Sequence, residues 1–148
     1  MADHEDTVEI LLVGGHPQES ELVLQALRHC SLTDRILVIQ DGAEAIDYLF
    51  ARGRYLKRKA ATTPKLVLLG HGKHAGDGLQ VLRELRRQDP MRAIPVVILA
   101  SSARDPEVEA AYLLGANSYV VMPSDPKALQ DAVERLGSYW LLVNRVPA

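Results

Sequence analysis

Several features that would settle the class of this protein early are missing from its sequence. It has one cysteine, Cys30, in 148 residues, so no disulfide can form within the chain. It has no apolar run near the roughly 18 residues that a membrane-spanning helix needs, and its beginning is acidic where a secretory signal would be basic and then apolar. A net charge of −2 creates no strong field for nucleic acid or anionic lipid. We therefore expect a cytoplasmic protein that binds neither nucleic acid nor membranes.

What the sequence does have is enough apolar material for one sizeable core, because hydrophobic residues make up 47% of the chain. We predict a single domain over residues 8–148, preceded by a flexible tail over residues 1–7. Short apolar runs with the length of buried strands occur at Val8–Val13, Ile36–Ile39, Leu66–Leu69, Pro95–Leu99 and Ser118–Val121. Amphipathic stretches that predict helices lie after these runs, at Gln18–Cys30, Ala43–Arg52, Gly78–Gln88, Pro106–Leu114 and Pro126 to about Val143.

Five strands that alternate with five helices predict an α/β fold. Strands that are apolar throughout are buried on both faces, so the sheet should be parallel and covered by helices on each side. Right-handed crossovers then give a doubly wound sheet. Ligands of such folds bind at the carboxyl ends of the strands. The loops Gly14–Pro17, Gly70–His74 and Ala100–Ser102 should therefore surround one crevice.

The order of these segments resembles the receiver domain of bacterial response regulators, over nearly the whole chain from Val8 to Trp140. The segments that carry this resemblance are Ile10–Pro17, Asp41–Ala45, Leu66–Leu69, Gly76–Leu79, Ile94–Leu99, Gly115–Val120 and Pro123. The resemblance implies a flavodoxin-like, receiver-type fold. The end of the chain from Tyr139 and the segment around Phe50–Thr63 resemble a subgroup, the single-domain regulators that partner phytochromes.

The resemblance also implies where the chemistry of a receiver should lie, and at these positions the sequence departs from the family. Receivers hold Mg²⁺ with an acidic pair after the first strand, where this chain has Gly14 and Gly15. Their phosphoryl-accepting aspartate ends the third strand, where this chain has Gly70. Ala100 replaces the hydroxyl residue that contacts the phosphoryl group, and Met122 replaces the lysine that pairs with it.

These replacements predict a degenerate receiver, or pseudo-receiver. Glycine has no nucleophile to accept a phosphoryl group, and Mg²⁺ usually needs one or two carboxylates beside the phosphate. Phosphorylation, a cofactor and enzymatic catalysis are therefore not expected. No Gly-x-Ser-x-Gly sequence surrounds Ser101 and Ser102, so they do not predict a nucleophile.

Two alternatives remain for the altered crevice. The glycines at positions 14, 15, 70 and 72 either let backbone N–H groups approach an anion or a nucleotide, or fill a decayed pocket permissively. His16, His71 and His74 lie on loops at the same predicted edge, and imidazole suits transition metals. The chain could accordingly be a metal-sensing or small-ligand-sensing domain rather than a protein-binding module.

The residues that receivers use to pass a signal to a partner are present in this sequence. Tyr119 matches the aromatic switch residue of receivers, although it is also typical of a half-buried strand, and the resemblance implies a cis peptide before Pro123. Tyr139, Trp140, Leu141 and Leu142 begin a run too apolar to be wholly exposed, so it either folds back or packs on a second chain. We expect a homodimer that binds a sensor histidine kinase or another signalling protein.

A basic segment separates the second predicted helix from the third predicted strand. Residues 52–63 carry five lysines and arginines. Charged connections are normally solvated surface loops. The alternative interpretation of this segment is a patch that binds an acidic partner.

Overall fold

The computed structural model describes residues 8–58, 63–72, 78–87 and 91–146. The predicted flexible tail, residues 1–7, lies outside them. The strands are β1 Ile10–Val13, β2 Ile36–Ile39, β3 Leu66–His71, β4 Val96–Ala100 and β5 Ser118–Val121. The longer helices are α1 Pro17–His29, α2 Gly42–Leu49, α3 Gly78–Arg87, α4 Asp105–Leu113 and α5 Pro126–Ser138. The 3₁₀ turns η2 Gly53–Tyr55 and η3 Met91–Ala93 and the π-helical turn η4 Tyr139–Val143 complete the described elements.

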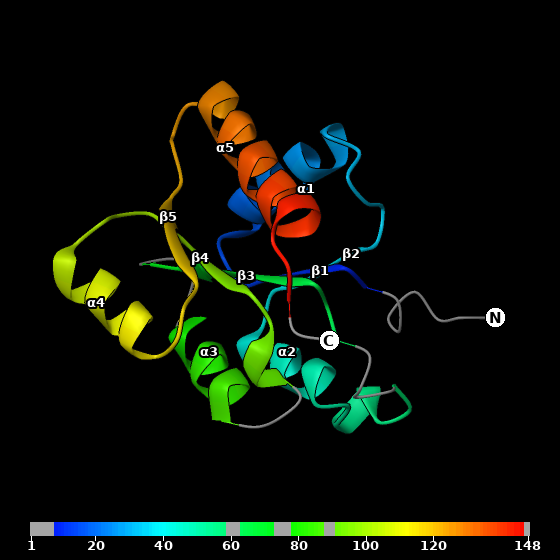
Figure 1. The fold of residues 1–148 in the computed structure, drawn as a ribbon. Coiled ribbons are helices and arrows are strands. Elements are labelled where there is room, and N and C mark those ends of the chain that lie inside the picture. Colours follow the sequence, from blue (N-terminus) through cyan, green and yellow to red (C-terminus); the bar gives the residue numbers. More distant parts are fainter. Residues whose placement is uncertain (1–7, 59–62, 73–77, 88–90, 147–148) are drawn as a thin grey trace.

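The strands form one parallel sheet in the order β2-β1-β3-β4-β5, which confirms the predicted doubly wound fold. Figure 1 shows α1 and α5 on one face of this sheet and α2 and α3 on the other, with α4 beside β5. Side chains of β1 alternate between the two cores: Leu11 and Val13 face the α2 and α3 side, whereas Ile10 and Leu12 face α1 and α5. No helix in the described ranges is long and apolar enough to cross a bilayer.

Several element boundaries differ from the prediction, and two of these differences have an identifiable structural reason. Strand β3 runs to His71, beyond the predicted end at Leu69, because Gly70 and His71 continue the pairing with β4. Helix α2 ends at Leu49 rather than at Arg52. Ala51 adopts a positive φ of 54°, and the N–H of Arg52 donates to the carbonyl of Asp47, so the chain leaves the helical path. The first difference depends on pairing with a strand that is distant in sequence, and the second on a backbone turn at the end of α2.

The basic segment contains a buried arginine, which is neither of the two roles considered for it. Arg58 is 6% exposed. Its Nε donates to the carbonyl of Tyr48 at 2.6 Å and its Nη2 to the carbonyl of Leu49 at 2.7 Å, at the C-terminal end of α2. The guanidinium also lies over the Tyr48 ring, 4.3 Å from its centroid. Arg58 therefore caps the C-terminal end of α2 by binding its carbonyl groups, instead of forming part of a binding patch.

A second arginine, Arg86, joins three segments on the α3 side of the sheet. Its Nε donates to the carbonyl of Gly115, and its Nη1 donates to the carbonyls of Arg92 and Ile94. Its Nη2 donates to Oδ1 of Asn117 at 2.7 Å. Partial burial lowers the pKa of this guanidinium. Arg86 thus links the end of α3 to η3 and to the turn that leads into β5.

Glu9 gives the fold a measurable acid sensitivity. The side-chain hydrogen bond from Lys65, at 2.9 Å, lowers the pKa of Glu9, with a further hydrogen bond from the Thr33 hydroxyl. A carboxylate with a lowered pKa stabilises the fold above its unfolded pKa, and this contribution is lost as the pH falls through the folded pKa. We expect the stability difference between wild type and Glu9→Gln to shrink below about pH 4. Urea unfolding of both proteins between about pH 7 and pH 3 measures this difference. Lys65→Met should weaken the pH dependence of stability, because it removes the hydrogen bond to Glu9. A stability difference between wild type and Glu9→Gln that stays constant over this pH range would contradict the prediction.

Candidate functional site

The carboxyl ends of the strands surround a cavity of about 360 Å³ between the sheet, α1 and the start of α5. All five positions at which the sequence departs from the receiver pattern contribute to its lining: Gly14, Gly15, Gly70, Ala100 and Met122. Pro123 lines it as well. The predicted crevice therefore exists, and it brings together residues that are up to about a hundred positions apart in the chain.

The loop between β1 and α1 forms the floor of this cavity and is held from two sides. Gly14 and Gly15 both adopt the left-handed conformation, with φ of 68° and 86°. The N–H of Gly14 donates to the carbonyl of Ile39 at 2.9 Å. The hydroxyl of Ser20, a buried residue of α1, donates to the carbonyl of Gly14 at 2.8 Å. The loop is consequently fixed close to the end of β3.

Gly70 lies directly beneath this loop. A Cβ atom at position 70 would lie 2.8 Å from the nitrogen and 2.9 Å from the Cα of Gly15. These are backbone atoms, so they cannot move aside as the end of a flexible side chain could. The space that a side chain at position 70 needs is thus taken by the backbone of the β1–α1 loop.

The cavity is poor in groups that could hold Mg²⁺. The walls are mostly aliphatic, and Glu19 on the first turn of α1 is the charged side chain among the lining residues. Gly14, Gly15 and Gly70 offer no side-chain oxygen, and within the described ranges no three His, Cys, Asp or Glu residues gather as a metal site. Since Mg²⁺ prefers carboxylate oxygen ligands, the residues present do not fit the ion that the family pattern implies.

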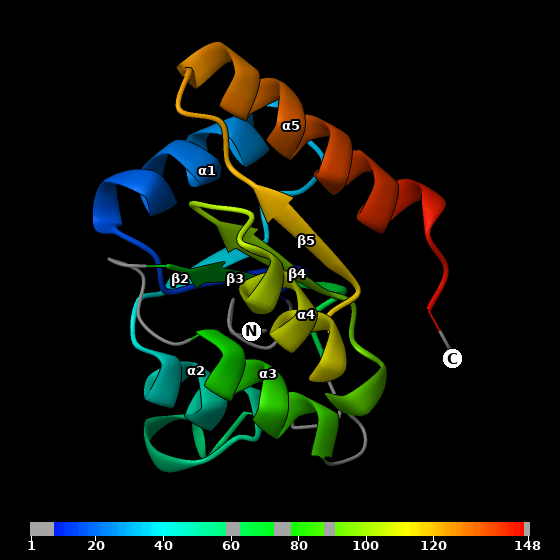
Figure 2. The ribbon, with the colours of Figure 1, turned by 90° about the vertical axis from the view of Figure 1, so that its left-hand side faces the viewer.

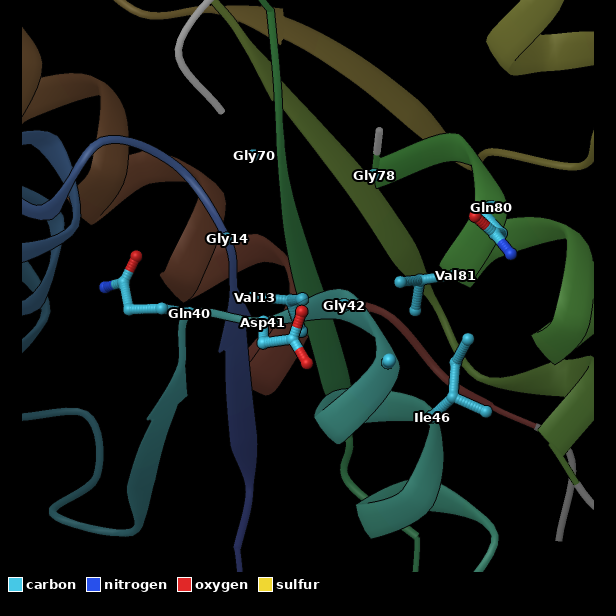
Figure 3. Close-up of a pocket in the computed structure, with 11 residues that line it drawn as sticks. Val13, Gly14, Gln40, Asp41, Gly42, Ile46, Gly70, Gly78, Gln80 and Val81 are labelled. Carbon is cyan, nitrogen blue, oxygen red and sulfur yellow. The ribbon is translucent and has the colours of Figure 1, made fainter. Parts of the chain in front are cut away.

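A second hollow, of about 340 Å³, lies on the opposite face of the sheet (Figure 3). Gly14 and Gly70 reach it from one side, and Ile46 of α2 and Val81 of α3 form its far wall. Its charged side chain is Asp41, whose carboxylate accepts from the N–H of Glu44 and so caps α2. This carboxylate is engaged in helix capping.

The structure describes two of the three histidines of the metal hypothesis, so it does not test them as a set. His16 is the N-cap of α1, and its Nδ1 accepts from the N–H of Gln18 at 3.2 Å. His71 ends β3, and its buried Nδ1 has no hydrogen-bond partner among the described residues. His74 lies outside the described residues. Beside His71, Gly72 has a φ of 144°, and a Cβ there would lie 2.6 Å from the hydroxyl oxygen of Ser101.

Comparison with known proteins agrees with this architecture. The sequence profile of the response regulator receiver domain matches residues 10–134. The chain belongs to the receiver domain family. It is 36% identical over 143 residues to the probable methanogenesis regulatory protein FilR2 of Methanothrix harundinacea, covering 97% of this chain and 90% of that protein. It is 31% identical over 139 residues to the response regulator Rcp1 of Synechocystis, covering 94% and 92%.

Solved structures of receivers superimpose closely on this one. The Mn²⁺-bound form of Rcp1 has a TM-score of 0.81 at 31% identity, covering 94% of this chain and 98% of that chain. The phosphorylated cyanobacterial phytochrome response regulator RcpA has a TM-score of 0.83 at 28% identity, covering 94% and 97%. The chain is therefore a receiver of two-component signalling that resembles phytochrome response regulators.

In this receiver, Tyr119 is anchored to the loop that follows β4. It lies on β5 and is partly buried, and its hydroxyl donates to the carbonyl of Ser102 at 2.8 Å. Desolvation raises the pKa of its phenol, and the negative charge of Glu107 adds to this. Next to it, the N–H of Met122 donates to the carbonyl of Ala100 at 2.8 Å. The end of β5 is thereby tied to the wall of the cavity.

The apolar run at the end of the receiver is partly folded back on the domain and partly exposed. Trp140 and Leu141 are partly buried and pack against the core on the α1 and α5 side. Tyr139 and Leu142, together with Val143, are exposed on the π-helical turn that follows α5. Figure 2 shows this turn continuing α5 on the side of the molecule where β5 begins.

Ser20 is the residue of this site that sequence reasoning missed. It shares a helical face with Val23 and Leu27, both of which are buried. A serine on an otherwise apolar face needs a hydrogen-bond partner when it is buried. That pattern was the available signal, although it does not identify the carbonyl of Gly14 as the acceptor.

Proposed function

We propose that this receiver acts without phosphorylation, as a protein-binding module in two-component signalling that is linked to a phytochrome. The observation that carries the proposal is Gly70, which has no nucleophile and lies against the backbone of Gly14 and Gly15. The related Rcp1 and RcpA have been solved in Mn²⁺-bound and phosphorylated forms. This chain has Gly70 at the position of the acceptor aspartate and Gly14 and Gly15 at the positions of the metal-binding carboxylates, which supports the proposal. Its partner would be a sensor histidine kinase or another signalling protein.

Amide NMR of untagged protein with Mg²⁺ and beryllofluoride, a phosphoryl mimic, tests this proposal. We expect no amide resonance to move beyond the effect of Mg²⁺ and fluoride alone, which is the matched control. Without an acceptor carboxylate the mimic has no covalent anchor, and a ligand with no differential interaction cannot shift a conformational equilibrium. Joint shifts of Gly70, Tyr119 and the residues of α4 would overturn the proposal.

The proposal includes a homodimer formed through the exposed part of η4. Leu142 is 69% exposed beside Tyr139 and Val143, and clustered exposed aromatic and aliphatic side chains are typical of interfaces. We expect Leu142→Asp to convert the dimer to a monomer in sedimentation velocity experiments. Leu56→Asp is the matched control, because Leu56 is 75% exposed at the far end of η2. A monomeric wild type, or equal dissociation in both variants, would contradict this part of the proposal.

A further inference from the structure

The cavity at the carboxyl end of the sheet has the size and lining of a small-molecule site. Its volume of about 360 Å³ falls within the range of roughly 300 to 1,000 Å³ that ligand pockets occupy. Aliphatic side chains from four elements and a loop form its walls: Leu12, Leu22, Val23, Leu99, Met122 and Leu129. A mostly aliphatic lining with a few polar groups is typical of sites that bind apolar small molecules.

Polar groups lie at a few points of this apolar lining. Ser101 follows β4 and Ser124 follows β5, and both are exposed residues that border the cavity. Glu19 lies on the α1 side. A carboxylate accepts hydrogen bonds and repels anions, and hydroxyl groups both donate and accept. Glu19 is exposed to solvent and the other lining residues are uncharged, so the lining suits an uncharged ligand that carries a hydrogen-bond donor.

The cavity is preformed rather than dependent on a ligand. Its floor is fixed by the hydrogen bonds of Gly14 to Ile39 and of Ser20 to Gly14. Its far wall is fixed by the hydrogen bond of Met122 to Ala100. Preorganisation of this kind lowers the conformational entropy that a ligand must remove on binding.

We propose that this cavity binds a small, uncharged and mostly apolar molecule with an N–H or O–H donor. The inference rests on the proposed loss of phosphorylation, because a phosphoryl group with its metal would need the same space. Binding would also reach the output side of the domain. Ser101 in the wall adjoins Ser102, whose carbonyl holds the Tyr119 hydroxyl.

Methyl and amide NMR titration with indole tests the proposal. Indole is uncharged, aromatic and carries one N–H donor. We expect the methyl signals of Ala100 and Met122 and the amide of Tyr119 to shift, with a dissociation constant on the order of 1 mM. Indole-3-acetate should bind about fivefold more weakly because of Glu19. This difference should narrow in Glu19→Gln and persist in Glu21→Gln, whose side chain is on the same helix and does not line the cavity.

A variant that narrows the cavity separates this site from nonspecific binding. Leu22→Trp enlarges an exposed side chain at the border of the cavity, and we expect it to weaken indole binding about fivefold. Leu113→Trp makes the same change on α4, outside the lining, and should leave the affinity unchanged. Both positions are exposed, so the variants should fold.

The outcomes distinguish the two proposals. Unmoved Ala100 and Met122 signals at about 5 mM indole would overturn the ligand site, as would equal weakening by both tryptophan variants. Tighter binding of indole-3-acetate than of indole would overturn the ligand class. Shifts confined to the cavity lining would overturn the link to Tyr119. A response to beryllofluoride would overturn the proposed function instead.

Discussion

Gly70→Asp is expected to lower the free energy of unfolding by about 3 kcal/mol and to give a protein that acetyl phosphate does not label. The Cβ atom of the new side chain would lie 2.8 Å from the nitrogen of Gly15, so the β1–α1 loop must be displaced. That loop is held by the Ser20 hydroxyl and by the carbonyl of Ile39. Restoring the nucleophile therefore costs stability, while the metal ligands are still absent at Gly14 and Gly15.

Urea unfolding and intact-protein mass spectrometry measure the two parts of this prediction. Gly70→Ala is the matched control, because it introduces the Cβ without the carboxylate and should lose a similar amount of stability. If Gly70→Asp has the same unfolding midpoint as wild type, the β1–α1 loop moves aside without a loss of stability and this part of the prediction is wrong. A mass increase of one phosphoryl group after treatment with acetyl phosphate would show that a carboxylate at position 70 is sufficient.

Arg86→Ala is expected to lower the free energy of unfolding by about 3 kcal/mol. The guanidinium supplies hydrogen bonds to the carbonyls of Gly115, Arg92 and Ile94 and to the side chain of Asn117. Removing it leaves these acceptors to find water at a site that is partly buried. The cost should exceed that of an ordinary surface substitution, because one residue ties α3 to two other segments.

Arg87→Ala provides the comparison on the same helix. Arg87 is exposed, and its ion pair with Glu84 spans 3.4 Å at the surface, so its removal should change stability by less than about 0.5 kcal/mol. Urea unfolding of both variants measures the difference. Equal losses at positions 86 and 87 would mean that the hydrogen bonds of Arg86 contribute little.

The sequence predicted the sheet well because each strand is a local apolar run. Strands β2 and β5 have the predicted bounds, and the altered receiver positions line one cavity as their places at strand ends implied. The metal hypothesis for His16, His71 and His74 stays a prediction, because His74 lies outside the described residues. Spacing along the chain places residues at an edge of a sheet but does not make their side chains converge.

The interactions that were not predicted depend on tertiary contacts between segments without a local signal. Arg58 lies in a basic stretch whose composition is typical of a surface loop, yet its guanidinium donates hydrogen bonds to carbonyls at the end of α2. Arg86 resembles its exposed neighbour Arg87 in sequence and differs in what surrounds it. The β1–α1 loop fills the space that a side chain at position 70 would need. This too depends on backbone geometry that residue types alone do not specify.

The left-handed conformations of Gly14 and Gly15 bear on how this receiver could change over generations. An aspartate at either position must adopt a conformation that L-residues rarely take, and one at position 70 meets the loop itself. An aspartate introduced alone at position 14, 15 or 70 is therefore expected to reduce stability. Stepwise substitution toward the acidic residues of the family would pass through less stable proteins, so this backbone opposes their gradual recovery.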